Sequence, residues 1–199
     1  MSRRIEDWDD HFILSGDINM TNAEGYLPPS EFSGVLNGHG HIITNLTINE
    51  PGSAWIGAIG RLSGNGRIDN LGLADVSITG RHCVGGLLGM NDHGTVTSCF
   101  ASGSVTSVIG PNRFYAGGLV GRNLFGSITS SFANVSVNGL FHVGGLTGSN
   151  AAGSIASCYA TGAVSGNSWG GGLVGAHSGW ITSCYATGPV TGFSSLGGG

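Results

Sequence analysis

A short glycine-rich block recurs along this chain at a nearly constant interval. The sequence Gly-Gly-Leu-Leu-Gly at 85–89 returns in close copies at 117–121, 144–148 and 171–175, and a weaker copy lies at 57–60. The glycines that open each Gly-x-x-Gly are 29, 32, 27 and 27 residues apart. A fixed period of about 20–50 residues is typical of solenoids and related repeat folds, whose single repeats cannot bury their apolar face alone. The repeat therefore constrains the fold more than any other feature.

Two further β-type runs follow each glycine block. The first reads Val-Thr-Ser-Cys-Phe-Ala at 96–101 and returns as Ile-Thr-Ser-Ser-Phe-Ala, Ile-Ala-Ser-Cys-Tyr-Ala and Ile-Thr-Ser-Cys-Tyr-Ala. The second is centred on an apolar residue that a glycine usually follows two positions later; the centres are Ile78, Val105, Val137, Val164 and Val190. Runs this short lack the 3.6-residue period of a helix and favour strands.

Three short strands per repeat of about 27 residues predict an all-β fold, a right-handed parallel β-helix of about five to six coils. In this β-solenoid each strand pairs with its copy one coil away, at a spacing of about 4.8 Å. The handedness follows the general preference of parallel crossovers. A propeller blade would need about 40 residues. We expect residues 1–30 to form an N-terminal cap strand region and residues 31–199 to form the repeats, with an incomplete last coil.

Substitutions among the copies indicate which positions face inward. We align Leu46 and Leu71 with Cys99, and Ile48 and Leu73 with Ala101. Positions that exchange Leu or Ile for Cys or Ala are typical of a core. Alternation along a strand then predicts that the aromatic residue between the two core positions points outward. This pattern gives a candidate exposed aromatic binding ladder, formed by Phe100, Phe132, Tyr159 and Tyr185.

The glycines and the charges are both unevenly used. The 39 glycines keep register with the repeat, and we expect them to supply positive φ at corners and to allow close approach of coils. All eleven carboxylates lie between Glu6 and Asp92, and after residue 92 the only basic residues besides histidine are Arg113 and Arg122. No basic stripe exists for nucleic acid, and no run of 18 apolar residues for membrane insertion. Residues 1–7 lack the apolar core of a signal peptide.

The repeat also resembles a known family. A hydrophobic-Gly pair and Gly-Leu-x-Gly, followed by Gly-x-Ile-x-x-Cys-Tyr-Ala-x-Gly-x-Val-x-Gly, is similar to the GLUG motif. The resemblance covers roughly residues 8–199 and implies a β-solenoid of a large bacterial surface protein, adhesin-like, or of a non-catalytic region of an IgA-cleaving metallopeptidase. The zinc-binding pattern His-Glu-x-x-His is absent, because no histidine is followed by glutamate. The peptidase activity of such relatives therefore does not carry over.

The first coils hold the residues that could carry chemistry. Six charged residues could cluster there, as in β-helices that cleave acidic sugars, although a solvated polar face is the favoured interpretation: Asp69, Asp75, Asp92, Arg61, Arg67 and Arg81. His39 and His41 stand in Gly-His-Gly-His, which is either a metal or catalytic pair or, as we favour, a turn. We expect no catalytic residue, no cofactor and no metal ligand.

Three of the four cysteines occupy one repeat column: Cys99, Cys158 and Cys184. A disulfide between Cys158 and Cys184 would suit the coil spacing, but buried free thiols are the favoured interpretation. Cys83 precedes a Val-Gly-Gly block, in a column that we interpret as a variable exterior corner. We therefore treat it as a candidate exposed thiol.

These features favour a non-catalytic structural or adhesive module of an extracellular or cell-surface protein, with host or matrix glycans or proteins as partners. One alternative is a β-helix that binds or cleaves carbohydrate. Another is a filament subunit that self-associates through an uncapped C-terminal coil at Leu196, Gly197 and Gly198, because a bare solenoid end exposes unpaired backbone groups.

Overall fold

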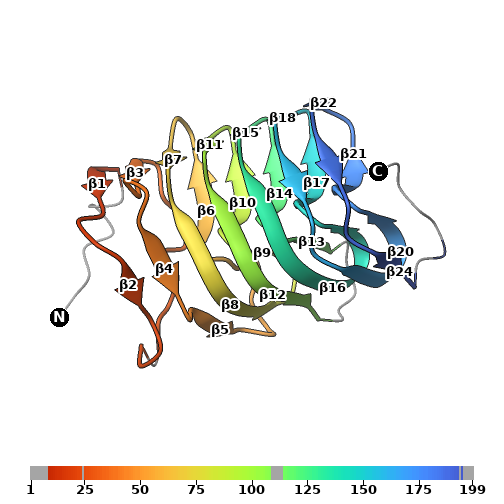
Figure 1. The fold of residues 1–199 in the computed structure, drawn as a ribbon, viewed down its shortest axis with the longest axis horizontal. Coiled ribbons are helices and arrows are strands. Elements are labelled where there is room, and N and C mark those ends of the chain that lie inside the picture. The colour runs from red at the N-terminus through yellow and green to blue at the C-terminus, as the bar shows by residue number, and fades with distance from the viewer. Residues whose placement is uncertain (1–8, 24, 109–113, 193, 195–199) are drawn as a thin grey trace.

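The structure, a computed structural model, describes residues 9–23, 25–108, 114–192 and 194. The chain winds as a parallel β-solenoid of about six coils, and its first and last described strands lie at opposite ends of the stack (Figure 1). The predicted all-β parallel β-helix is confirmed. Among the described residues, no helix has the length and apolar character needed to cross a membrane.

Three parallel sheets run along the stack. Sheet 1 contains β1 (His11–Ile13), β3 (Val35–Asn37), β7 (Arg67–Asp69), β11 (Thr95–Thr97), β15 (Ser127–Thr129), β18 (Ser154–Ala156) and β22 (Trp180–Thr182). Sheet 3 contains β6 (Ile59–Ser63), β10 (Leu88–Asp92), β14 (Val120–Leu124), β17 (Thr147–Ala151) and β21 (Val174–His177).

Sheet 2 holds the longest strands and lies between the other two in chain order. Its members are β2 (Ile18–Asn19), β4 (Ile42–Thr44), β5 (Thr47–Asn49), β8 (Gly72–Gly80), β9 (Cys83–Gly85), β12 (Phe100–Ser107), β13 (Tyr115–Gly117), β16 (Phe132–Gly144), β19 (Tyr159–Ala160), β20 (Val164–Gly171), β23 (Tyr185–Ala186) and β24 (Val190–Thr191). At the N-terminal end, β1 pairs with β3 and β2 pairs with β4 as further parallel strands.

The strands pair in the register that the repeat predicts. Val96 pairs with Ile68 on one side and Ile128 on the other, and Val105 pairs with Ile78 and Val137. In the glycine blocks, each opening glycine hydrogen-bonds to its copy one coil away, from Gly86 to Gly118 and onward to Gly145 and Gly172. Repeat copies in the sequence are therefore physical neighbours in the fold.

The inward columns are also confirmed for the regular coils. Cys99 and Ala101 are 1% and 0% exposed, and the Phe100 side chain between them is only half-buried. The alignment of the first copy is wrong: Leu73 pairs with Ile43, whereas Ile48 pairs with Ile78. Leu46 and Ile48 are nevertheless buried. The strands of the first coil are spaced differently from those of the regular coils. The alignment assumed the regular spacing, and it therefore matched Ile48 with Leu73 and not with its true partner Ile78 on the same strand.

Left-handed backbone makes the corner between sheets 1 and 2. Ser98, Ser130, Ser157 and Ser183 have φ between 49° and 54°, and Asn70 and His39 hold the same corner in earlier coils with φ of 51° and 53°. Non-glycine residues adopt this region at a cost, and surrounding structure must enforce it. The corner falls inside the Val-Thr-Ser-Cys-Phe-Ala run, which therefore ends one strand and begins the next.

The glycines of the Gly-x-x-Gly blocks serve close approach and not positive φ. The described glycines with positive φ are Gly25, Gly40, Gly64, Gly103 and Gly192, none of them in such a block. The expectation of close approach is confirmed, whereas the expectation of positive φ holds for these five positions and not for the blocks. A methyl group on Gly118 would lie 2.9 Å from the Ala133 Cβ atom, and one on Gly117 would lie 2.7 Å from the Gly148 nitrogen. A side chain at these positions would force the coils apart.

Gly117→Ala should lower the free energy of unfolding by about 1–3 kcal/mol, because the new methyl group meets backbone atoms that cannot move independently. Gly52→Ala is the matched control, since a Cβ there has no atom within 4 Å, and its effect should stay within about 0.5 kcal/mol. Urea unfolding followed by circular dichroism measures both. Equal stability of the two variants would contradict the close-packing role of the block glycines.

Candidate functional site

The predicted aromatic ladder is a continuous stack on the outside of sheet 2. Ring centroids are 5.0 Å apart for Phe100 and Phe132, 4.8 Å for Phe132 and Tyr159, and 5.2 Å for Tyr159 and Tyr185, with interplanar angles of 2° to 5°. Gly72 holds the same column in the preceding coil, and a Cβ there would lie 2.5 Å from the Phe100 ring. The missing side chain leaves room for the first ring.

Stacking changes what the ladder can bind. Both faces of each inner ring pack against the neighbouring rings, so mainly the ring edges face the solvent. Tyr185, at the C-terminal end, is 56% exposed, whereas the other three rings are half-buried. The ladder therefore stabilises the coil-to-coil register, and it does not offer a row of open faces on which planar or ring-shaped ligands could stack.

A second stacked column lies at the corner that precedes the Val-Gly-Gly blocks. Tyr115 and His142 have ring centroids 5.1 Å apart, and His142 and Trp169 have centroids 6.1 Å apart. The Arg122 guanidinium lies 5.3 Å from the Tyr115 ring centre, within cation–π range. Sequence reasoning identified this corner as exterior but missed its stacking, because the column mixes Trp, Cys, Tyr and His.

Cys83 belongs to the same corner, but it is not an exposed thiol. Its side chain is 2% exposed, and burial raises its pKa to about 12. Cys83 lies between Trp55 and Tyr115 in its column, and these much larger neighbours shield the small side chain from solvent. The prediction from the exterior column is therefore wrong for this residue.

The cysteine column is buried and unbridged. Cys99 and Cys158 are each 1% exposed, Cys184 is half-buried, and all of the cysteines are free thiols. In each contact between coils, a backbone N–H donates to the side chain of the equivalent residue in the next coil. The Cys99 N–H donates to the Ser131 hydroxyl, the Ser131 N–H to the Cys158 sulfur, and the Cys158 N–H to the Cys184 sulfur at 3.3 Å. The column thus accepts hydrogen bonds at the left-handed corner.

A buried asparagine ladder is the feature that sequence reasoning missed. Asn91, Asn123 and Asn150 are 0% exposed and lie in one column of sheet 3. Each of the first two donates its amide N–H to the Oδ1 atom of the next at 2.8 Å. Every ladder residue also donates to the carbonyl of the glycine three positions on, at 3.0 to 3.2 Å.

The asparagine ladder ties the corner between sheets 3 and 1 to the core. The residue that precedes Asn91 in this column is Leu62, whose side chain has no hydrogen-bond donor. The Oδ1 atom of Asn91 therefore has no hydrogen-bond partner. The signal in the sequence is an Asn two residues after the last block glycine and three before another glycine, as in Gly89-Met-Asn91 with Gly94. Such a pairing of positions predicts a side chain that caps a turn.

The charged residues of the first coils do not form one cluster. Asp92 ends a strand of sheet 3, Asp69 lies in sheet 1 and Asp75 in sheet 2. Asp92 contacts Arg61 and His93, and Asp69 contacts Arg67. Burial alone would raise the pKa of Asp92, but hydrogen bonds from Arg61 and His93 outweigh it and lower the pKa. The joint site that was the less favoured interpretation of these carboxylates is therefore not formed, since they lie in three different sheets.

The Gly-His-Gly-His segment is a turn, as favoured. His39 has φ of 53°, and its backbone N–H donates to the Asn37 side chain at 2.8 Å. The His41 Nδ1 atom lies 3.1 Å from Asp17. Asp17 also accepts a hydrogen bond from the Ile42 backbone, which is the main reason that the pKa of this carboxyl is lowered. Among the described residues, no three His, Cys, Asp or Glu side chains group in a way that could hold a metal ion.

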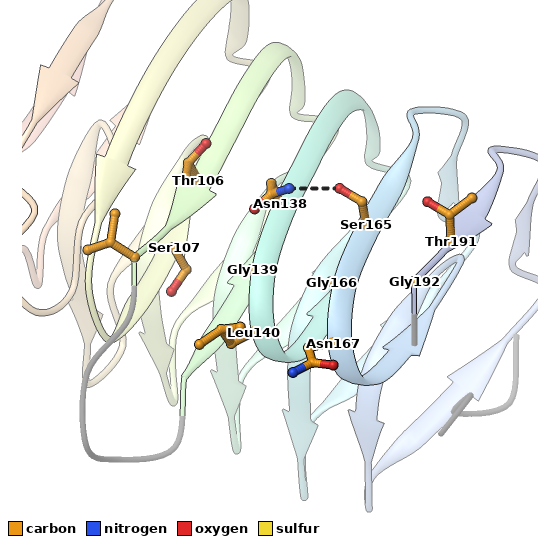
Figure 2. Close-up of a pocket in the computed structure, with 11 residues that line it drawn as sticks. Thr106, Ser107, Asn138, Gly139, Leu140, Ser165, Gly166, Asn167, Thr191 and Gly192 are labelled. Carbon is orange, nitrogen blue, oxygen red and sulfur yellow. Dashed lines mark hydrogen bonds between the residues drawn. The ribbon is translucent and has the colours of Figure 1, made fainter. Parts of the chain in front are cut away.

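The described surface also carries a groove beside the third-run segments of the sheet 2 strands. It has a volume of about 850 Å³ and crosses several coils, as Figure 2 shows. One wall carries hydroxyl and amide side chains from successive coils; they are Thr106, Asn138, Ser165 and Thr191. The glycines that follow the third run of the repeat, Gly139, Gly166 and Gly192, lie next to this wall. Gly139 is buried, and a Cβ there would face the core, 3.1 Å from Val143.

A comparison with family models decides what kind of repeat this is. The model described as the GLUG motif matches residues 80–106, 112–138 and 139–165. The chain contains three GLUG motifs. The first and third matches each span one coil, because their last residues, Thr106 and Ser165, pair with Thr79 and Asn138, the residues just before each match begins. The GLUG motif therefore corresponds to one turn of the solenoid.

Two curated relatives share parts of these GLUG repeats. Halomucin from Haloquadratum walsbyi is 43% identical over 74 residues, which cover 37% of this chain and 1% of halomucin. A "Putative Gly-rich membrane protein" from Evansella cellulosilytica is 38% identical over 100 residues, which cover 43% of this chain and 11% of the relative. The chain thus corresponds to a small part of each of these proteins.

A solved structure shares the fold of the GLUG repeats. The crystal structure of a "putative immunoglobulin A1 protease" from Bacteroides ovatus aligns with a TM-score of 0.75 and 22% sequence identity. The alignment covers 92% of this chain and 60% of that one. At this identity the similarity establishes the solenoid fold alone.

Asn123→Ala should lower the free energy of unfolding by about 2–4 kcal/mol, because it leaves the Asn91 amide, the Asn150 Oδ1 atom and the Gly126 carbonyl short of partners inside the protein. Asn134→Ala is the matched control, because Asn134 is exposed and lies in sheet 2, away from the ladder in sheet 3. This variant should change the free energy of unfolding by less than about 0.5 kcal/mol. Urea unfolding provides the measurement. If the two variants were equally stable, the asparagine ladder would carry no net stabilisation.

Cys184 should react first with a thiol reagent at pH 8, since it is half-buried and the other cysteines are buried. Burial raises the pKa of Cys158 to about 11 and of Cys99 to about 12, so about one part in a thousand or less of either is thiolate at that pH. Timed labelling and mass spectrometry measure the order. Cys184→Ser should abolish the first phase, and rapid labelling of Cys83 in the folded protein would contradict its burial.

Proposed function

We propose that this chain is a non-catalytic structural module, a rigid spacer in a surface or secreted protein. The observation that carries the proposal is the continuity of stacking from coil to coil. The aromatic column, the cysteine column and the buried asparagine ladder each link successive coils. Linked columns on several sides of one coil resist bending and sliding, which is the property that a spacer needs.

The names of the relatives support a place outside the cell. Halomucin, the Gly-rich membrane protein and the immunoglobulin A1 protease carry names of surface or secreted proteins. Short matches within much longer relatives suit a repeat that recurs in large proteins. The polar, charge-poor outer surface from residue 93 onward is consistent with this proposal, because such a surface stays soluble without making strong non-specific ionic contacts.

The arrangement of carboxylates favours a module without catalytic activity. Hydrolysis or lytic cleavage of polysaccharide needs two carboxyl groups across the scissile bond, or a calcium site with a basic residue. In the first coils, Asp92 and Asp69 are each engaged by an arginine, in different sheets. A role in adhesion remains compatible with the same surface. Self-association through Leu196, Gly197 and Gly198 stays a prediction, because these residues lie outside the described part of the chain.

The purified chain should release no reducing ends from neutral or acidic polysaccharides above the level of a heat-inactivated sample. Asp92→Asn should behave as the wild type in this assay, since Asp92 is held by Arg61 and His93 and has no catalytic task. Small-angle X-ray scattering on the same samples should report a rod of constant cross-section. Product release that depends on Asp92, or a flexible scattering profile, would each refute the proposal.

A further inference from the structure

The groove on sheet 2 has a wall that repeats its chemistry in every coil. Thr106 pairs in register with Asn138, Asn138 with Ser165, and Ser165 with Thr191. Four rows at a coil spacing of about 4.8 Å place hydrogen-bonding groups along about 14 Å, parallel to the solenoid axis. A ligand in this groove therefore meets the same kind of group at regular intervals.

The row next to the polar wall begins on the core side of the strands. In this row Ser107 is followed by Gly139, Gly166 and Gly192 in successive coils. The Ser107 hydroxyl donates to the Arg81 carbonyl and is buried, and a Cβ on Gly139 would face the core, 3.1 Å from Val143 and 3.3 Å from Ala116. Leu140 and Asn167 stand on the side opposite the polar wall, as Figure 2 shows. The groove thus has one polar wall and an opposite wall that is partly apolar.

The polar groups of the wall keep hydrogen-bonding capacity. Asn138 donates one amide N–H to the Ser165 hydroxyl at 2.9 Å, which leaves a second N–H and the Oδ1 oxygen. The hydroxyls of Thr106 and Thr191 can each donate and accept. Hydroxyl and amide groups next to an apolar side chain match a sugar ring, which has hydroxyls along its edges and C–H groups on its faces.

The lining excludes other classes of ligand on chemical grounds. None of the described residues that line the groove carries a charge, so these residues offer no ionic contact to an acidic glycan, a nucleic acid or a charged peptide. Strand addition by a peptide needs unpaired backbone groups at a sheet edge. The strands β12, β16 and β20 beside this groove already pair with the coils on either side, as in the hydrogen bond from Val137 to Ala163. Among the described strands that line it, only β24 at the last coil pairs on one side alone, with β20.

We propose that this groove binds a linear neutral glycan, which runs parallel to the solenoid axis. Successive pyranose rings of an extended glycan are about as long as one coil is high, so each ring meets one row of the wall. Asn138 and Ser165 are the central contacts, and Leu140 packs against the C–H face of a ring. The inference deepens the proposed function, on which it rests for binding without cleavage.

The test uses neutral and control oligomers on the folded chain. We would titrate cellotetraose, laminaritetraose and mannotetraose as neutral probes, with tetragalacturonate and the peptide Ser-Gly-Ser-Gly as controls. Amide chemical shifts measured by NMR locate the site, and calorimetry gives the affinity. At least one neutral tetrasaccharide should shift amides of Thr106, Asn138, Ser165 and Thr191 in a saturable way, whereas both controls should shift none of them.

Asn138→Ala combined with Ser165→Ala should weaken binding of that tetrasaccharide about tenfold or more, since two hydrogen bonds of about 1 kcal/mol each are lost. Asn134→Ala combined with Ser136→Ala is the matched control, because both residues are exposed on the same strand but lie outside the groove, and it should leave the affinity unchanged. Asn138, Asn134 and Ser136 are exposed and Ser165 is half-buried, so both double variants should fold as the wild type.

Three results would overturn the inference: no binding of any neutral tetrasaccharide, shifts confined to the aromatic ladder, or equal affinity of the two double variants. Binding of the peptide in place of the glycans would assign the groove to a protein partner and would also overturn it. Failure here leaves the spacer role standing, because that role is judged by scattering. Conversely, release of reducing ends from a bound glycan would refute the non-catalytic proposal while leaving the site in place.

Discussion

The in-register parallel pairing of one coil with the next is the interaction on which this structure depends. It sets a spacing of about 4.8 Å between equivalent backbones, so every side chain has its own copies as its nearest neighbours along the axis. A residue type that stacks on itself is stabilised in a column, and one that repels itself is not. The absence of carboxylates after Asp92 agrees with this constraint, because a column of like charges at that spacing would be destabilising.

The same spacing explains how strained corners are tolerated. Left-handed backbone at Ser98 and its copies costs free energy in each coil. The next residue in each corner belongs to the cysteine column, where side chains accept backbone N–H groups from the preceding coil. The asparagine ladder acts differently at the corner between sheets 3 and 1. Each asparagine donates to the carbonyl of the glycine three residues on, within its own coil, and the asparagines of successive coils are linked to one another. Buried polar columns therefore support the corners both within a coil and between coils.

The sequence was sufficient to predict the coil length, the parallel pairing and the inward columns of the regular coils, because these depend on periodicity alone. It was insufficient for the first coil, where Ile48 pairs with Ile78 and not with Leu73. Periodicity cannot detect a coil whose strands are spaced differently. The burial of Cys83 was missed because exposure depends on the size of the column neighbours. The asparagine ladder had a signal in the sequence, but the inward columns were predicted only from exchanges of Leu or Ile for Cys or Ala, which leave out polar residues.

The candidate sites show why periodicity predicts positions better than function. The aromatic ladder stands where alternation placed it, yet stacking with interplanar angles of 2° to 5° covers the faces through which aromatic rings bind ligands. A solenoid that fills each column with self-stacking side chains has little concave surface. The groove on sheet 2 is lined by a different kind of column, in which Thr106, Asn138, Ser165 and Thr191 carry hydroxyl and amide groups and no stacked rings. In a fold whose exterior is built from columns, the place to look for a ligand is therefore a column of side chains that keep hydrogen-bonding capacity toward the solvent.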